Sequence, residues 1–230
     1  MNKIKALVFD LDRTLYDRWS TLRGVCYLMR HRFPRWWKKG MSFEEFYGEF
    51  HDSDCEHIYG GWEEVHEDFL RKGMFVDPPG VDQFRDEILE CFKIIAVPIP
   101  TVRDMLCEFR EKGYKLGIIT NGESKLQWKK IELLDFNPLF DSILVSGDLG
   151  FGKPDVRIFQ KMADDLGVAP EEMVFIGDGP YIDVQGAYNI GCTPVFIKTS
   201  GEWRYPEVLE PEFQLNDVTE LPELIEQMGW

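Results

Sequence analysis

The chain has 230 residues, enough for one substantial hydrophobic core or for a core with a smaller second unit. Its 26 Lys and Arg stand against 41 Asp and Glu, and the net charge of −15 would repel nucleic acid, which we therefore exclude as an expected partner. The five cysteines show no CxxC spacing, and no apolar run approaches the roughly 18 residues of a membrane span. We expect a reduced, cytoplasmic protein with no export signal and no membrane contact.

The first predicted element is a strand. Residues 4–9 form a nearly unbroken apolar run, a pattern typical of a parallel strand that is covered on both faces. Similar runs recur later in the chain, at residues 116–119, 143–145, 173–176 and 194–197. Helix-compatible stretches separate most of them, and this alternation predicts an α/β fold with a parallel sheet.

The segment from residue 15 to residue 98 has a different pattern. It holds few compact β-branched runs, whereas Leu22, Cys26 and Met29 recur at helical spacing. We therefore expect a mainly α-helical domain inserted over residues 15–98. The remaining core domain would consist of residues 1–14 and 99–230.

Two helices are predicted after the insertion. The first covers residues 101–112. The second covers residues 154–166, with Pro154 as its first residue and with Val156, Phe159 and Met162 on one apolar face.

Two carboxylates follow the first strand directly. Asp10 and Asp12 are two positions apart, so in extended chain they point to the same side and can converge on one ligand. At the carboxyl end of a parallel strand, such a pair suits metal binding, or work as a nucleophile and an acid/base. A solvated acidic turn explains the pair as well, and this feature alone leaves both interpretations open.

Further polar residues follow the later strands. Thr120 and Asn121 place a hydroxyl and an amide-rich turn where phosphoryl oxygens could be held, although a strand-end hydroxyl more often bonds locally. Lys153 lies at a predicted helix start, where a cation opposes the helix dipole, so it could face an anion instead. A solvated loop lysine is the structural alternative.

A final acidic pair follows the run at 173–176. Asp178 can reach the same centre as Asp10. Asp183 could join it, or could be an N-terminal helix residue that the helix dipole favours.

Taken in order, these motifs resemble those of the haloacid dehalogenase superfamily across essentially the whole chain. They are Asp10-Leu-Asp12-Arg-Thr14, then Thr120, then Lys153 within Gly-Lys-Pro-Asp, then Gly177-Asp178 through Asp183. Each is weak alone, but the ordered set is highly specific. The resemblance implies a Rossmann-like three-layer α/β core with a helical cap domain inserted after the first motif. Arg13 departs from the pattern, because relatives often carry Gly or Asn there.

The activity that the resemblance implies is Mg²⁺-dependent hydrolysis of a small phosphate ester, such as a nucleotide or a sugar phosphate. Asp10 would attack phosphorus and form a phospho-aspartate. Asp12 would protonate the leaving alcohol and then deprotonate the hydrolytic water.

The same resemblance assigns the binding residues. Mg²⁺ prefers oxygen ligands, and Asp10, the backbone carbonyl of Asp12, and Asp178 would hold it, with Asp183 in support. The implied phosphate ligands are Thr120, the backbone amide of Asn121, and Lys153.

The insertion carries a basic stretch without acidic residues at 19–40. Arg23 and Arg30, seven positions apart, would lie on one side of a helix. They would form part of a solvated basic face, or would reach an anionic substrate as cap residues do in the resembled family. The aromatic residues of the insertion are expected to build its core rather than a stacking surface; they are Trp19, Trp36, Trp37, Phe43, Tyr47 and Trp62.

Three alternatives stand beside the hydrolase. A phosphomutase would share every core residue and return the phosphoryl group to a sugar. A haloacid dehalogenase needs no second carboxylate at the position of Asp12, so Asp12 favours phosphate chemistry. A non-catalytic binding module would be expected to lack a motif, and none is lacking. The sequence leaves a monomer and a homodimer equally open.

Overall fold

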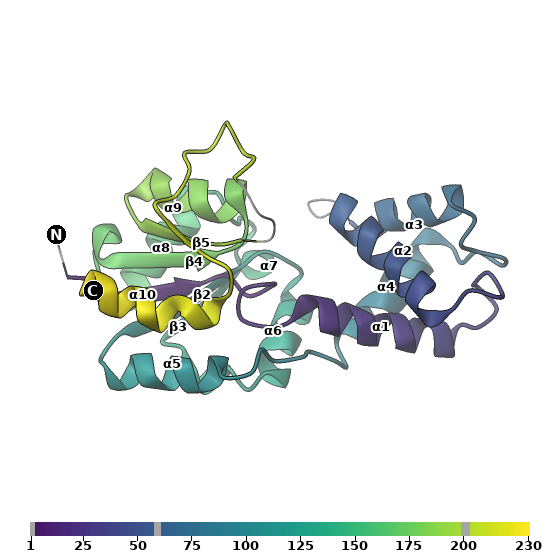
Figure 1. Cartoon of the computed structure of the whole chain (residues 1–230), viewed down its shortest axis with the longest axis horizontal. Coiled ribbons are helices and arrows are strands. Elements are labelled where there is room, and N and C mark those ends of the chain that lie inside the picture. Colours follow the sequence, from purple (N-terminus) through teal and green to yellow (C-terminus); the bar gives the residue numbers. More distant parts are fainter. Residues whose placement is uncertain (1–2, 58–60, 199–202) are drawn as a thin grey trace. The chain divides into compact units, whose positions relative to one another are not determined.

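The computed structural model describes residues 3–57, 61–198 and 203–230. The chain folds into two compact units (Figure 1). One consists of Met1–Asp17 with Pro98–Trp230, and the other of Arg18–Val97. The inserted unit thus spans Arg18–Val97, whereas the predicted insertion spans residues 15–98.

The first unit is built on a six-stranded sheet in the order β3-β2-β1-β4-β5-β6, with every neighbouring pair parallel. The strands are β1 (Ala6–Phe9), β2 (Lys115–Thr120), β3 (Ser142–Val145), β4 (Met173–Gly177), β5 (Thr193–Ile197) and β6 (Phe213–Leu215). The predicted α/β fold with a parallel sheet is confirmed. The central strand β1 has a neighbour on each side, and all of its residues are buried.

The strand register determines where the polar motif residues lie. Phe9 pairs with Ile118 of β2 and with Ile176 of β4. The chain segments that follow these three strands therefore leave the sheet at the same edge, as expected for parallel strands.

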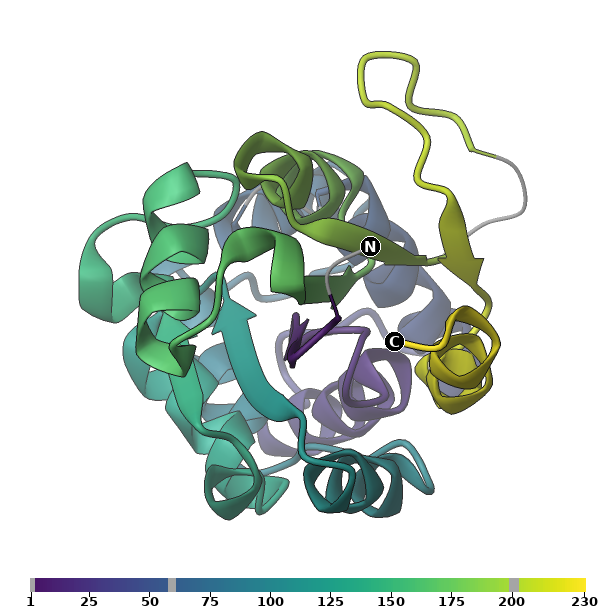
Figure 2. The same ribbon diagram turned by 90° about the vertical axis from the view of Figure 1, so that its left-hand side faces the viewer.

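Helices cover both faces of the sheet (Figure 2). Ala6 and Val8 of β1 lie in one buried cluster with residues of α8 (Val156–Leu166) and α9 (Gln185–Ile190). Figure 2 shows two further helices on the opposite side of the sheet. They are α5 (Val102–Glu111) and α10 (Leu221–Met228). The core unit thus has the three layers expected from the sequence.

The predicted start of α8 is wrong. The helix begins at Val156 rather than Pro154, because the Asp155 side chain accepts a hydrogen bond from the Arg157 backbone and caps the helix. Of the predicted apolar face, Phe159 and Met162 are buried, whereas Val156 is 44% exposed and Ile158 is buried instead.

The second unit consists of α1 (Arg18–Arg32), α2 (Phe43–Glu56), α3 (Trp62–Arg71) and α4 (Val81–Phe92). Trp37 lies at its centre, with ring centroids 4.8 Å from Phe46 and 5.7 Å from Phe50. The prediction that the aromatic residues build a core is confirmed for Trp36 and Trp37, which are buried. The other four are partly exposed: Trp19, Phe43, Tyr47 and Trp62.

Within the described parts of the chain, none of the helices has the length and apolar character needed to cross a membrane.

Candidate active site

A buried ion pair marks the carboxyl end of β1. The Nζ atom of Lys153 lies 2.5 Å from Oδ1 of Asp10 and 2.7 Å from Oδ1 of Asp183. All three side chains are buried. The lysine therefore faces two anions, and the interpretation of Lys153 as a solvated loop residue is wrong.

A third carboxylate, Asp178, lies beside Asp10 and Asp183. Oxygen atoms of Asp10, Asp178 and Asp183 lie within 4.8 Å of one another. Asp183 also accepts a hydrogen bond of 2.8 Å from the Gly179 backbone. Gly177 makes this packing feasible, because a Cβ atom there would lie 2.4 Å from Oδ2 of Asp183. We refer to Asp10, Asp178 and Asp183 as the acidic cluster.

Two carboxylates of the acidic cluster, Asp10 and Asp178, are costly to ionise. Burial raises the pKa of Asp10 to about 6 against the opposing charge of Lys153. Burial likewise raises the pKa of Asp178 to about 8, and here Arg13 is the strongest opposing charge. A divalent cation would favour the charged forms of these carboxylates, and the set of buried carboxylate oxygens fits Mg²⁺, a hard ion with oxygen ligands.

Arg13, the departure from the family pattern, is part of this centre. Its backbone has a φ of 63°, in the left-handed region that a side chain rarely adopts. Its Nε atom lies 2.8 Å from Oδ2 of Asp178. Arg13 and a metal ion would therefore interact with the same carboxylate.

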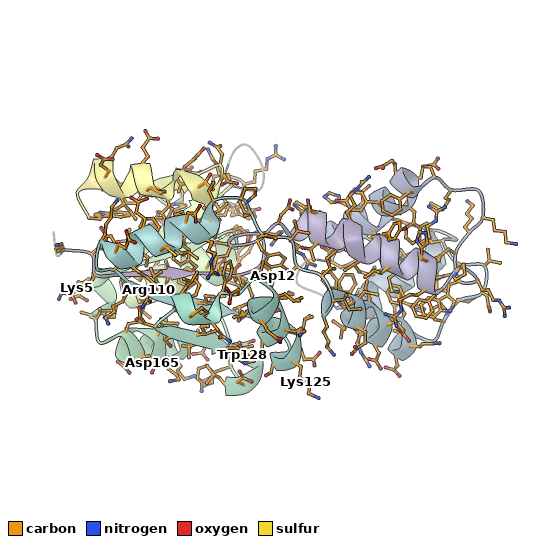
Figure 3. All side chains as sticks on the ribbon, turned by 90° about the horizontal axis from the view of Figure 1, so that it is seen from below. Lys5, Asp12, Arg110, Lys125, Trp128 and Asp165 are labelled. Atoms are coloured by element: carbon orange, nitrogen blue, oxygen red, sulfur yellow. The ribbon has the colours of Figure 1, made fainter. Side chains whose placement is uncertain are left out.

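Asp12 lies in a different set of contacts. Its Oδ1 and Oδ2 atoms are 2.8 Å and 3.0 Å from Nζ of Lys130. The Gln127 amide donates to Oδ2 at 2.9 Å, and the Tyr16 hydroxyl donates to Oδ1. Gln127 and Lys130 belong to α6 (Ser124–Leu133), and Figure 3 labels Asp12 together with Lys125 and Trp128 of this helix.

Thr120 contacts Gln127, which also contacts Asp12, and Asn121 contacts the backbone of Lys153 beside the acidic cluster. The buried Thr120 hydroxyl accepts a hydrogen bond of 2.5 Å from the Gln127 amide, so Gln127 connects it to Asp12. The Asn121 side chain donates to the Lys153 carbonyl at 2.8 Å and accepts from the Lys153 amide at 2.9 Å. Gly152 lets Asn121 approach this closely, since a Cβ atom there would lie 2.4 Å from the Asn121 amide oxygen.

Tyr16, Gln127 and Lys130 were not predicted from the sequence. One signal could have found two of them. Gln127 and Lys130 recur with Ile131 and Leu134 at helical spacing, which puts two polar residues on the buried face of a helix.

Arg23 and Arg30 lie on α1 of the inserted unit and have partners within that unit. Arg23 forms an ion pair with Glu44, with Nη1 2.8 Å from Oε2. Arg30 donates to the Met41 carbonyl and lies 5.5 Å from the centre of the Phe46 ring. These contacts give both arginines a structural role, and their contact with substrate stays a prediction.

Solved structures with the same fold cover nearly the whole chain. YfnB, a magnesium-bound HAD-hydrolase from Bacillus subtilis, matches with a TM-score of 0.80 at 19% identity, covering 97% of this chain and 99% of that one. A HAD phosphatase from Thermococcus onnurineus matches with a TM-score of 0.63 at 26% identity, covering 96% and 98%.

Sequence comparisons identify the family. The glyceraldehyde 3-phosphate phosphatase of Pyrococcus furiosus is 30% identical over 98% of this chain and 93% of its own length. The N-acylneuraminate-9-phosphatase of Mus musculus is 28% identical over 99% of this chain and 96% of its own length. The family model for haloacid dehalogenase-like hydrolases matches residues 4–191. With its family model matched over most of its length and its motif residues gathered at one edge of the sheet, the chain belongs to the haloacid dehalogenase-like hydrolases.

Proposed function

We propose that this protein is a Mg²⁺-dependent phosphatase that hydrolyses a small phosphate monoester through a phospho-aspartate on Asp10. The observation that carries the proposal is the buried Asp10–Lys153 pair at the end of β1, with a second carboxylate, Asp12, held nearby in the same loop. Asp10 is a nucleophile with a charge partner, and Asp12 is available for proton transfer.

In the first half-reaction, a carboxylate oxygen of Asp10 attacks phosphorus while the bond to the leaving alcohol breaks. Asp12 gives a proton to the departing oxygen. Because burial raises the pKa of Asp10 to about 6, this carboxylate is mostly ionised near pH 7.5 and is more basic than an exposed one. Lys153 offsets the negative charge that builds up between nucleophile and phosphate.

In the second half-reaction, Asp12 accepts a proton from the water that attacks the phospho-aspartate. Inorganic phosphate leaves, and the Asp10 carboxylate is restored. Thr120, the backbone amide of Asn121, and Lys153 would hold the non-bridging oxygens in both steps.

The metal would be held by Asp10, the backbone carbonyl of Asp12, and Asp178, with Asp183 in support. When bound, it would neutralise the charge of the phosphoryl group and orient it.

The proposed substrate class is a phosphate monoester of a small organic alcohol. Relatives with similar overall identity are named for glyceraldehyde 3-phosphate and for N-acylneuraminate 9-phosphate. The similarity therefore supports a class of substrate rather than one metabolite. The presence of Asp12 argues against a dehalogenase, whose chemistry has no leaving alcohol to protonate.

The test is phosphate release from a panel of monoesters with Mg²⁺ and with a chelator. We expect Mg²⁺-dependent release from several small alkyl esters and from para-nitrophenyl phosphate, and no halide release from 2-chloropropionate. Hexose 1-phosphates serve as the control for mutase activity, since a mutase would convert them to hexose 6-phosphates without net phosphate release. Halide release, isomerisation alone, or full activity in the chelator would contradict the proposal.

We also expect Mg²⁺ to stabilise the fold more at pH 8 than at pH 5. Carboxyl groups ionise near pH 4 in unfolded chains. The raised pKa values of Asp10, about 6, and Asp178, about 8, make the metal-free fold lose stability as the pH rises from about 4 to about 8. A bound cation favours the ionised carboxylates and offsets this loss.

The measurement is the unfolding midpoint at both pH values, in Mg²⁺ and in chelator. Asp178→Asn should reduce the gain from Mg²⁺ at pH 8, and Asp86→Asn, at an exposed site of the inserted unit, should leave it unchanged. An equal gain at both pH values would be evidence against metal binding at the acidic cluster.

A further inference from the structure

Lys130 is a buried cation that the proposed mechanism does not use. It is 3% exposed, and Gln127, one helical turn earlier on α6, is 1% exposed. Burying an ammonium group has a desolvation cost that an apolar side chain of similar volume would avoid. A buried lysine on a helix therefore calls for an explanation in its partners.

Those partners are at the proposed catalytic centre. Lys130 contacts both carboxylate oxygens of Asp12, and it donates to the Gln127 amide oxygen at 2.7 Å. The nitrogen of the same amide donates to Asp12 and to Thr120. One glutamine thus connects the proposed acid/base with the proposed phosphate-binding hydroxyl.

We propose that Gln127 and Lys130 are positioning residues that fix the Asp12 carboxylate relative to the phosphate site. This inference rests on the proposed function. Proton transfer needs the carboxylate oxygen within about 2.6–3.2 Å of the leaving oxygen or the water. With donors on both oxygens, Asp12 has little freedom to rotate, and its connection to Thr120 sets its place beside the phosphoryl group.

The role predicts a dependence on the leaving group. An alkoxide needs a proton in order to leave, whereas para-nitrophenolate leaves without one. In Lys130→Met and Gln127→Leu, kcat/KM for a small alkyl phosphate should fall by roughly 10- to 100-fold, the effect of a displaced catalytic group. For para-nitrophenyl phosphate, kcat/KM should change by less than about threefold, because kcat/KM reports only the step that forms the phospho-aspartate.

The second half-reaction gives an independent readout. Because Asp12 also activates the hydrolytic water, both variants should hydrolyse the phospho-aspartate slowly. We expect kcat to fall for both esters, and we expect a burst of nitrophenolate before the steady state. A role for Lys130 and Gln127 in stability alone would lower the unfolding midpoint without producing this burst.

The chain offers a matched control. Lys129 is the neighbouring residue on α6, its side chain is 37% exposed, and it pairs with Glu132 at 2.9 Å rather than with Asp12. Lys129→Met makes the same chemical change, and we expect parental kinetics. Lys130→Arg keeps a cation and should recover part of the lost activity on the alkyl ester.

The outcomes separate this inference from the proposed function. The proposed function stands if the parent hydrolyses both esters and Asp12→Asn lowers kcat/KM mainly for the alkyl ester. Folded Lys130→Met and Gln127→Leu proteins that lower kcat/KM for both esters equally, or for neither, would then overturn the positioning role alone. Should Lys130→Met fail to fold, Gln127→Leu decides, because it removes no charge.

Discussion

Asp10→Asn is expected to abolish hydrolysis of every phosphate ester while the protein stays folded. The amide has nearly the shape of the carboxylate but cannot attack phosphorus, so kcat should fall by roughly 10⁴-fold or more. Stability should be equal or higher at neutral pH, because burial makes the ionised form of Asp10 costly. Lys153 keeps its second partner, Asp183.

The measurements are phosphate release and thermal unfolding of purified Asp10→Asn, with Asp86→Asn as an exposed control that makes the same change. Incubation with a labelled ester should label the parent on Asp10 and leave the variant unlabelled. Turnover within a few-fold of the parent, with contaminating phosphatase excluded, would end the assignment of Asp10 as the nucleophile.

The sheet could be predicted because its central strands are buried on both faces. Runs such as β1 and β4 have no exposed position, and a continuous apolar pattern is the result. The edge strand β6 was missed because it has three residues and only Leu215 is buried. The start of α8 was missed because the preference of proline for the first helical turn was considered without the capping side chain of Asp155.

The acidic cluster could be predicted for a related reason. The carboxyl ends of neighbouring parallel strands lie side by side, so residues that follow separate apolar runs are expected to come together. This expectation needs no knowledge of their side-chain contacts. Lys130 follows no strand directly, and its helical spacing with Ile131 and Leu134 indicates only that it lies on the buried face of the helix. Its partner Asp12 lies 118 positions earlier in the chain, so the local sequence does not indicate their contact. Only the tertiary packing of α6 brings the two side chains together.

The second large effect is expected from Lys153→Met, which should remove both activity and much of the stability. Burial alone would lower the pKa of Lys153, but the carboxylates of Asp10 and Asp183 outweigh burial and raise it, so this lysine stays charged. Removing one partner from a buried ion pair leaves an uncompensated charge. We expect the free energy of unfolding to fall by about 3–5 kcal/mol at pH 7.5.

A charge-balanced double variant separates the two effects. Lys153→Met/Asp183→Asn removes one buried cation together with one buried anion, so much of the lost stability should return while turnover stays absent. Urea unfolding gives the stability and phosphate release gives the activity. Lys161→Met is the control, since Lys161 pairs with Asp165 on α8 at a partly exposed site and should change stability by no more than about 0.5 kcal/mol. If Lys153→Met were as stable as the parent, or if the double variant regained turnover, Lys153 would not be the charge partner on which Asp10 depends.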